Sequence, residues 1–231
     1  MSTIATTNIK EPSSATNNIT LTSGGDTTIS GNATVTGTPT FGGLTYPTAD
    51  GTAGQVLKTD GSGTLSFASP FTYGTEQALT GVNSHTFTGI PSTAKRITIL
   101  VIDASASATS IDQLAMQVGP SSGVITTNIY KYTVSYAASQ EGSTGNSYYR
   151  FLHSNYSDPS EVWNGRITLN KLTASSNTWI VESQIGTTGG FVNTSAGSFA
   201  LGSDVLERIK IYNDATGVNY DSGSINIMYE S

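Results

Sequence analysis

Apolar and polar residues alternate with a period of two along much of this 231-residue chain, the pattern that predicts β-strands. The run at residues 95–103 is the strongest, because its β-branched residues suit a central strand. No segment sustains the 3.6-residue period of a helix. Further strands are expected at residues 112–118, 124–137, 147–153, 162–172, 178–185, 205–213 and 224–229, with turns at 119–123, 140–145, 158–160, 175–177, 187–190, 214–217 and 221–223.

Residues 74–231 therefore predict an all-β domain, an antiparallel β-sandwich of the jelly-roll kind. A shorter Greek-key sandwich is the alternative. Ile209 and Ile211 alternate with Arg208 and Lys210, which places the isoleucines inward and the cations on a solvent-facing side of the sheet. We expect this head domain to fold on its own.

Residues 1–73 have a different character, with only five aromatic residues, all after residue 40. From residue 19, short alternating strands end at glycine turns and offer one or two apolar side chains each, too few to offset a backbone ordering cost of about 1–2 kcal/mol per residue. We therefore expect residues 19–73 to form a thin trimeric β-stalk and residues 1–18 a docking segment, the alternative being a disordered tail. The candidate trimer-core residues are Ile19, Leu21, Ile29 and Val35.

Residues 55–58 and 64–67 read as two strands joined by Asp60-Gly61-Ser62-Gly63. Asp-Gly is a strong hairpin signal, because it accommodates the turn whose twist matches that of the strands. The sequence therefore predicts a hairpin between the repeats and the head domain.

The stretch from Tyr46 to Phe67 follows the pattern Y-P-T-x-D-G-T-x-x-Q-V-L-x-T-D-G-x-G-x-L-x-F/W. It resembles a module of bacteriophage tail fibres and other virion appendages. The opening residues and the repeats at 19–37 are similar to the start of structural proteins from marine and cyanobacterial phages. The resemblance implies a homotrimer attached to the virion by its N-terminal end, and it does not choose between tail and capsid.

Charge and composition exclude several classes. The chain has 10 Lys+Arg, 16 Asp+Glu and a net charge of −6, the wrong sign for binding nucleic acid. No apolar run approaches the roughly 18 residues of a membrane span, and the N-terminus does not read as a secretory signal, so synthesis in a host cytoplasm is expected. The absence of cysteine removes disulfides and thiolate chemistry.

Candidate catalytic groups are few, and we predict no catalytic, metal-binding or cofactor-binding residue. His85 and His153 read as ordinary strand positions, and the Gly119–Gly123 stretch, although it matches G-x-S-x-G, lacks the following helix of a nucleophile elbow. The acids at 158, 161, 214 and 221 read as solvated loop residues. A carboxylate pair of a polysaccharide depolymerase and a Ca²⁺ site are the alternatives.

Aromatic residues crowd the middle of the C-terminal part, and amphipathic rings suit sugar and protein surfaces. Tyr148 and Tyr149 are adjacent in an expected strand, so one of them must leave the core. Asn155 and Tyr156 follow in an expected loop. These four residues are the candidate surface-binding residues, with a host-surface glycan or protein as partner, and residues 140–146 and 154–160 are expected to be outward loops.

The sequence thus predicts a non-enzymatic phage structural protein, a short trimeric fibre for host attachment. A capsid decoration or head fibre is the alternative, and a depolymerase is less favoured. A bacterial surface adhesin is disfavoured by the lack of an export signal.

Overall fold

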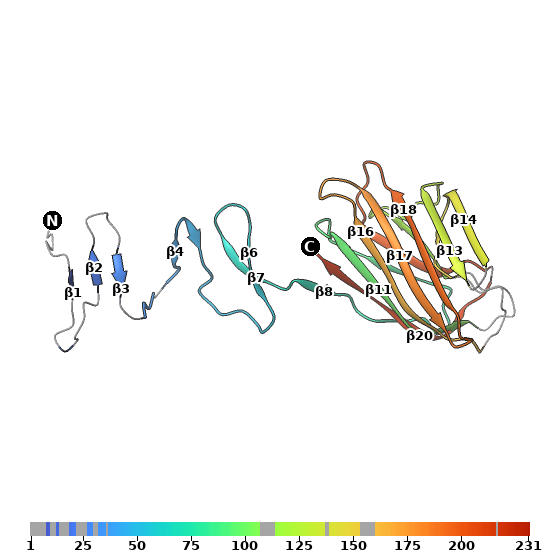
Figure 1. The fold of residues 1–231 in the computed structure, drawn as a ribbon, viewed down its shortest axis with the longest axis horizontal. Coiled ribbons are helices and arrows are strands. Elements are labelled where there is room, and N and C mark those ends of the chain that lie inside the picture. Colours follow the sequence, from blue (N-terminus) through green and yellow to red (C-terminus); the bar gives the residue numbers. More distant parts are fainter. Residues whose placement is uncertain are drawn as a thin grey trace. The chain divides into compact units, whose positions relative to one another are not determined.

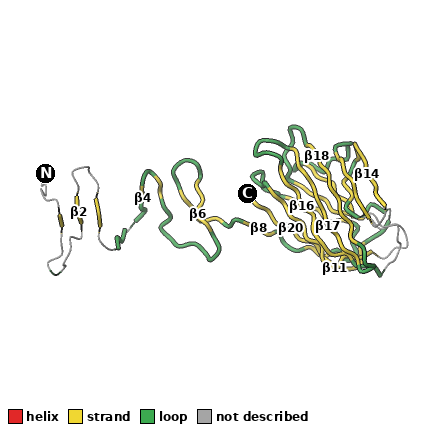
Figure 2. The backbone as a smooth tube through the Cα atoms, viewed as in Figure 1, coloured by secondary structure: helices red, strands yellow, loops and turns green. Residues whose placement is uncertain are grey.

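The computed structural model describes residues 8–9, 13, 19–21, 27–29, 32–35, 37–106, 114–136, 139–152, 160–215 and 217–231. These residues form strands, turns and loops with no helix among them, which confirms the all-β class (Figure 2). Contacts divide the chain into an N-terminal unit, Met1–Ser69, and a C-terminal unit, Pro70–Ser231. The boundary precedes the expected one after residue 73, because β8 (Phe71–Tyr73) pairs with the last strand of the C-terminal unit.

The N-terminal unit is built from small antiparallel sheets, each local in sequence (Figure 1). One pairs β1 with β2 and β2 with β3, and Ile19 lies opposite Ile29. Two hairpins, β4–β5 and β6–β7, follow. The strands are β1 (Asn8–Ile9), β2 (Ile19–Leu21), β3 (Thr27–Ile29), β4 (Thr40–Phe41), β5 (Leu44–Thr45), β6 (Val56–Thr59) and β7 (Leu65–Ala68).

The β6–β7 hairpin confirms the strand pair predicted around Asp60. Its turn is held by the Asp60 carboxylate, whose Oδ1 accepts hydrogen bonds from the backbone N–H of Ser62 at 2.7 Å and of Thr64 at 3.0 Å. Gly61 and Gly63 have φ angles of 78° and 94°, a region that favours glycine. The sequence signal succeeded here because the turn chemistry is local.

The C-terminal unit holds two antiparallel sheets. Among the described residues, the larger has nine strands in the order β14-β13-β18-β17-β16-β11-β20-β8, with β9 also pairing with β20, and the smaller has four in the order β10-β19-β12-β15 (Figure 1). Besides β8, the larger sheet contains β9 (Gln77–Ala78), β11 (Arg96–Ala106), β13 (Tyr130–Tyr136), β14 (Ser139–Asn146), β16 (Trp163–Lys171), β17 (Thr178–Thr187), β18 (Val192–Ala200) and β20 (Tyr220–Glu230). The smaller contains β10 (Ser84–Thr88), β12 (Leu114–Gly119), β15 (Tyr149–Arg150) and β19 (Arg208–Asn213).

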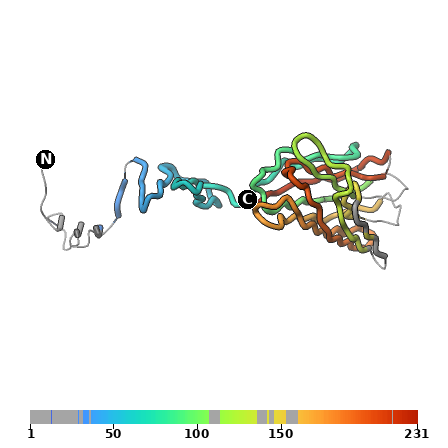
Figure 3. Tube along the Cα trace, turned by 90° about the horizontal axis from the view of Figure 1, so that it is seen from above, coloured from blue at the N-terminus to red at the C-terminus, as the bar shows by residue number. Residues whose placement is uncertain are grey.

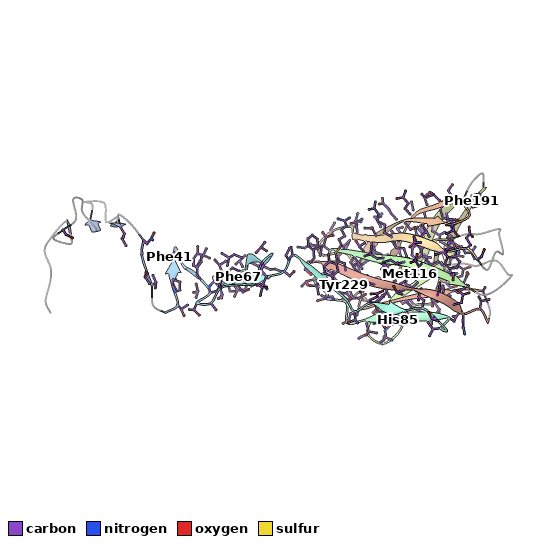
Figure 4. All side chains as sticks on the ribbon, turned by 90° about the horizontal axis from the view of Figure 1, so that it is seen from below. Phe41, Phe67, His85, Met116, Phe191 and Tyr229 are labelled. Atoms are coloured by element: carbon purple, nitrogen blue, oxygen red, sulfur yellow. The ribbon has the colours of Figure 1, made fainter. Side chains whose placement is uncertain are left out.

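One hydrophobic core is shared by both sheets. Ile97 and Ile99 of β11 are fully buried, as are Met116 of β12 and Ile209 and Ile211 of β19, which confirms the inward side predicted for the two isoleucines. In Figure 3 the orange strands β16–β18 lie along one side of this unit and the blue-green β10 along the other. Figure 4 shows Met116 among the side chains between them.

Several expected turns are strand residues. Residues 140–145 lie in β14, an end strand whose backbone pairs with β13, so the outward loop expected at 140–146 is wrong. Residues 221–223 lie in β20 beside an irregularity of β11, where Asp103 has a φ of 50° and Gly223 a φ of 89°. Polar, glycine-rich segments of the sequence therefore form an edge strand and a β-bulge as well as turns.

Candidate functional site

Tyr149 is fully buried, which corrects its place among the candidate surface residues. Its ring packs against Tyr132 and Phe151, with centroids 5.3 and 4.9 Å away. Its hydroxyl donates a hydrogen bond to the Val181 carbonyl at 3.1 Å, joining β15 to the larger sheet. Burial raises the pKa of this phenol well above its ordinary value. Tyr149 is therefore a core residue that links the sheets.

Tyr148 lies on the outer face of the smaller sheet and is half-buried. Its hydroxyl accepts a hydrogen bond from Arg150 Nη2 at 2.8 Å, and its ring meets that of Tyr212 edge to face, with centroids 6.5 Å apart. The ammonium of Lys210 lies 4.9 Å from the centre of the Tyr212 ring. We call Tyr148, Arg150, Lys210 and Tyr212 the small-sheet patch.

Arg150 and Asp214 form an ion pair beneath this patch, with Nη2 and Oδ2 3.1 Å apart and each side chain 10% exposed. Burial lowers the pKa of Arg150, but the charge and hydrogen bond of Asp214, together with Tyr132 and Tyr148, raise it overall. Such a pair is costly to break, because removal of one partner leaves a buried charge. The Asp214 carboxylate is therefore a structural group in an ion pair, and not the solvated loop acid that the sequence predicts.

The outer face of the larger sheet carries two neighbouring hollows over β11, β16 and β17. The first, of about 230 Å³, is lined by Arg96, Arg166, Thr168, Asn170, Glu182, Ser183 and Gln184. The second, of about 480 Å³, is lined by Leu100, Asn164, Gly165, Arg166, Gln184, Gly186 and Val192. Both include Arg166 and Gln184, which lie opposite each other in the register of β16 and β17. We call the two hollows together the large-sheet groove.

The sequence predicts the strands that form this groove but not the groove itself. Alternation in the expected strands 162–172 and 178–185 puts Arg166, Thr168 and Asn170 on one side and Glu182 and Gln184 on another. Those two sets share a face only because Thr168 pairs with Glu182 and Arg166 with Gln184. That register is a property of the folded sheet.

Other sequence candidates have structural roles. The His85 ring meets that of Phe87 edge to face, with centroids 4.9 Å apart, and burial lowers the pKa of His85. The Gly119–Gly123 stretch is a turn, as expected: Gly123 N–H donates to the Pro120 carbonyl at 3.2 Å. Asp221 bonds to the Ser105 hydroxyl, which also lies 2.8 Å from that of Ser222.

Several of the predicted residues belong to parts of the chain that the structure does not describe. Asn155, Tyr156, His153 and Asp158 lie outside the described residues, and so do the side chains of Ile19 and Leu21. Ile29 and Val35, the other candidate trimer-core residues, are 47% and 51% exposed in the single chain. Within the described ranges, no group of three or more His, Asp or Glu side chains is arranged to hold a metal ion.

No protein-family model, curated protein or solved structure matches the chain. The part of the chain that the structure describes contains no helix with the length and hydrophobicity needed to cross a membrane.

Proposed function

We propose that this chain is a non-enzymatic structural protein of a bacteriophage virion. In this proposal it forms a short homotrimeric fibre that docks onto the particle through residues 1–18 and displays the C-terminal unit for attachment to the host surface. The resemblance of residues 46–67 to modules of virion appendages supports the assignment to a virion. The exposed apolar side chains of the N-terminal unit support the trimer.

The observation that carries the proposal is the lack of buried side chains in the described part of the N-terminal unit. Between residues 29 and 69, none of the side chains that the structure describes is buried. Phe41 is 58% exposed, and Val56 and Leu57, which point to opposite faces of β6, are 50% and 48% exposed. Phe41 and Phe67 mark the two hairpins in Figure 4. The turns of the hairpins are nevertheless well defined. We infer that the exposed apolar side chains of this segment are buried against another surface.

Other copies of the same chain supply that surface most simply. A row of apolar side chains along one segment becomes a shared core when three copies surround one axis, and each copy then gains about 25 cal/mol per Å² of apolar area buried. A single two-stranded hairpin is marginally stable at best in water. We therefore infer that the hairpins and the repeats are stabilised together in the trimer.

Strand order supports a jelly-roll description of the C-terminal unit. In that fold, eight strands in two Greek keys place the first, eighth, third and sixth in one sheet and the second, seventh, fourth and fifth in the other. With β10 as the first strand, the order β10-β19-β12-β15 matches the former. The order β11, then β16–β18, then β13 and β14 matches the latter if the three-stranded meander takes the seventh place. The strands β20 and β8 extend the sheet beyond β11.

The oligomer can be tested with a matched pair of substitutions, one in β6 and one in the C-terminal unit. Light scattering should give three chain masses for the full-length protein. Leu57→Asp should lower the trimer's thermal stability or dissociate it, whereas Ser175→Asp, the same new residue in an exposed turn of the C-terminal unit, should leave it trimeric. A stable monomer at micromolar concentration would refute the trimer.

Capsid decoration is the second candidate function, favoured by the short stretch of repeats and hairpins between the docking segment and residue 70. Labelling of the chain on purified particles, viewed by electron microscopy, distinguishes a tail location from a capsid location.

Deletion of residues 2–18 should leave a folded trimer that no longer incorporates into particles, and normal occupancy on the particles would refute the docking role. A depolymerase, the less favoured alternative, would release reducing ends from host polysaccharide.

A further inference from the structure

We propose that the large-sheet groove is a binding site for a neutral oligosaccharide. The inference deepens the host-attachment part of the proposed function and rests on it for the biological source of the glycan. The groove itself belongs to the C-terminal unit alone. Two adjoining hollows form it, and the polar side chains that line it are uncommitted and balanced in charge.

The polar side chains of the first hollow are uncommitted. Within the described structure, Arg166, Glu182 and Gln184 make no side-chain hydrogen bond or ion pair, and the same holds for Thr168 and Asn170. Here a guanidinium, a carboxylate, two amides and a hydroxyl surround one hollow of about 230 Å³.

The chemistry of these groups fits the hydroxyls of a sugar. A hydroxyl both donates and accepts, so a ring with neighbouring hydroxyls can accept from a guanidinium or amide and donate to a carboxylate at the same time. Hydrogen bonds to charged groups are also the stronger ones. Arg166 and Glu182 provide one free charged donor group and one free charged acceptor on neighbouring strands, and Gln184 offers both functions.

Charge argues for a neutral ligand. Arg96 lies 3.4 Å from Glu230, and Arg166 shares the hollow with Glu182, so the two arginines are matched by two glutamates. The equal number of positive and negative side chains gives a phosphate or a uronic acid no advantage over a neutral sugar. The same charges argue against cover by a second copy of the chain, because charged residues are depleted at the centre of protein interfaces.

The second hollow extends the site along the sheet. It shares Arg166 and Gln184 with the first and adds Leu100 and Val192, which are 38% and 54% exposed. Its volume of about 480 Å³ lies within the usual range of about 300–1,000 Å³ for ligand pockets. Apolar side chains suit the C–H face of a sugar ring. One sugar unit in the polar hollow and the next against Leu100 and Val192 would occupy both.

The test is calorimetric titration of the full-length protein with maltohexaose, cellohexaose, mannohexaose, xylohexaose and chitohexaose, with hexagalacturonate as the acidic probe. We expect at least one neutral oligosaccharide to bind with little dependence on salt. Arg166→Gln and Glu182→Gln should each weaken that binding about tenfold or more, because each removes a charged hydrogen-bonding group. Lys210→Gln, in the small-sheet patch, is the matched control and should bind as wild type does.

The inference would be overturned by no binding of any neutral probe, by binding of hexagalacturonate alone that disappears with added salt, or by binding lost in Lys210→Gln and kept in Arg166→Gln. Circular dichroism of each variant confirms folding. Light scattering on the same samples separates the two proposals, because a monomer that binds glycan refutes the fibre and keeps the site, whereas a trimer that binds none does the reverse. A change of oligomer mass in Arg166→Gln would place the groove at a subunit interface and overturn it as well.

Discussion

At the scale of single residues, two neighbouring side chains of the C-terminal unit differ in burial. Tyr149 contacts the aromatic core and reaches Val181 across the sandwich, whereas Tyr148 remains half-buried beside Arg150. Tyr149 begins the short strand β15, and Tyr148 is the residue just before it. The difference in burial therefore implies a difference in their contributions to the free energy of unfolding.

We expect Tyr149→Ala to lower the free energy of unfolding by about 3–5 kcal/mol, as for other large buried aromatics. Tyr148→Ala should cost about 1–2 kcal/mol, because its ring keeps much contact with water. Urea titrations followed by fluorescence give both values. Equal losses would mean that the burial difference does not govern stability here.

Gly197 of β18 shows how the ring of Tyr149 is accommodated. A Cβ at this position would lie 2.0 Å from the Lys131 carbonyl oxygen and 2.9 Å from Tyr149 Cε2. By contrast, a Cβ at Gly186 would make an ordinary contact, 3.7 Å from the Asn164 carbonyl oxygen. Only the first position requires glycine for close approach.

Gly197→Ala should therefore destabilise the protein by about 3 kcal/mol or more, because backbone and a packed ring must both shift. Gly186→Ala should change stability by less than about 0.5 kcal/mol. Thermal unfolding of the two variants beside wild type provides the comparison. If the Gly197 variant melted with wild type, the packing described around Tyr149 would be wrong.

The period-two pattern could predict that Tyr148 and Tyr149 face opposite ways, and it could not tell which faces the core. That choice depends on the pairing of β15 with β12, where Met116 lies opposite Tyr149. The same limit hid the large-sheet groove, because Arg166 and Glu182 are neighbours only through the β16–β17 register. The local alternation of residues determines the face of the sheet on which a side chain lies. The long-range pairing of strands determines which side chains lie next to it.

At the scale of elements, turns with their own hydrogen bonds are the most predictable. The Asp60 hairpin was predicted in place, and so were β11, β16 and β17 with small shifts of their ends. The strands β14 and β18 were not, because Ser139–Asn146 and Val192–Ala200 are rich in Ser, Thr and Gly and carry little apolar alternation. Pairing with β13 and β17 makes them strands.

The Asp60 turn should respond to pH. Hydrogen bonds from the Ser62 and Thr64 N–H groups lower the pKa of the Asp60 carboxyl in the folded hairpin. Because the folded pKa lies below the unfolded one, the stabilising contribution is present above the ordinary aspartate pKa of about 3.9 and is lost as pH falls through the folded value.

Carbon-13 titration of the Asp60 carboxyl should accordingly give a midpoint below that of a free aspartate. The amide signals of Ser62 and Thr64 should shift with the same midpoint. Asp60→Asn, which keeps an acceptor oxygen and has no charge to titrate, is the control and should abolish the shared transition. An ordinary midpoint in the wild type would show that the two hydrogen bonds do not hold the turn in solution.

At the scale of the whole molecule, the two units differ in how they can be stable. The C-terminal unit has a continuous core from β10 to β20 with fully buried residues in both sheets, enough for a domain of its size to fold alone. The N-terminal unit shows no buried side chain among those described after residue 28. Composition already indicated this contrast, since the aromatic residues gather in the second part of the chain.

Residues 70–231 expressed alone should therefore be folded, with a cooperative thermal transition and the near-ultraviolet circular dichroism of packed tryptophan. They should associate more weakly than the full chain, because the apolar side chains that other copies would cover, such as Val56 and Leu57, are absent from the fragment. Sedimentation at several concentrations measures the association of the fragment against that of the full-length protein.

Residues 1–69 alone should show no cooperative transition at low concentration, because association is needed to form their core. An unfolded C-terminal fragment would remove the two-unit description, and a fragment that trimerised as strongly as the full chain would place the trimer contacts in the sandwich instead of the hairpins.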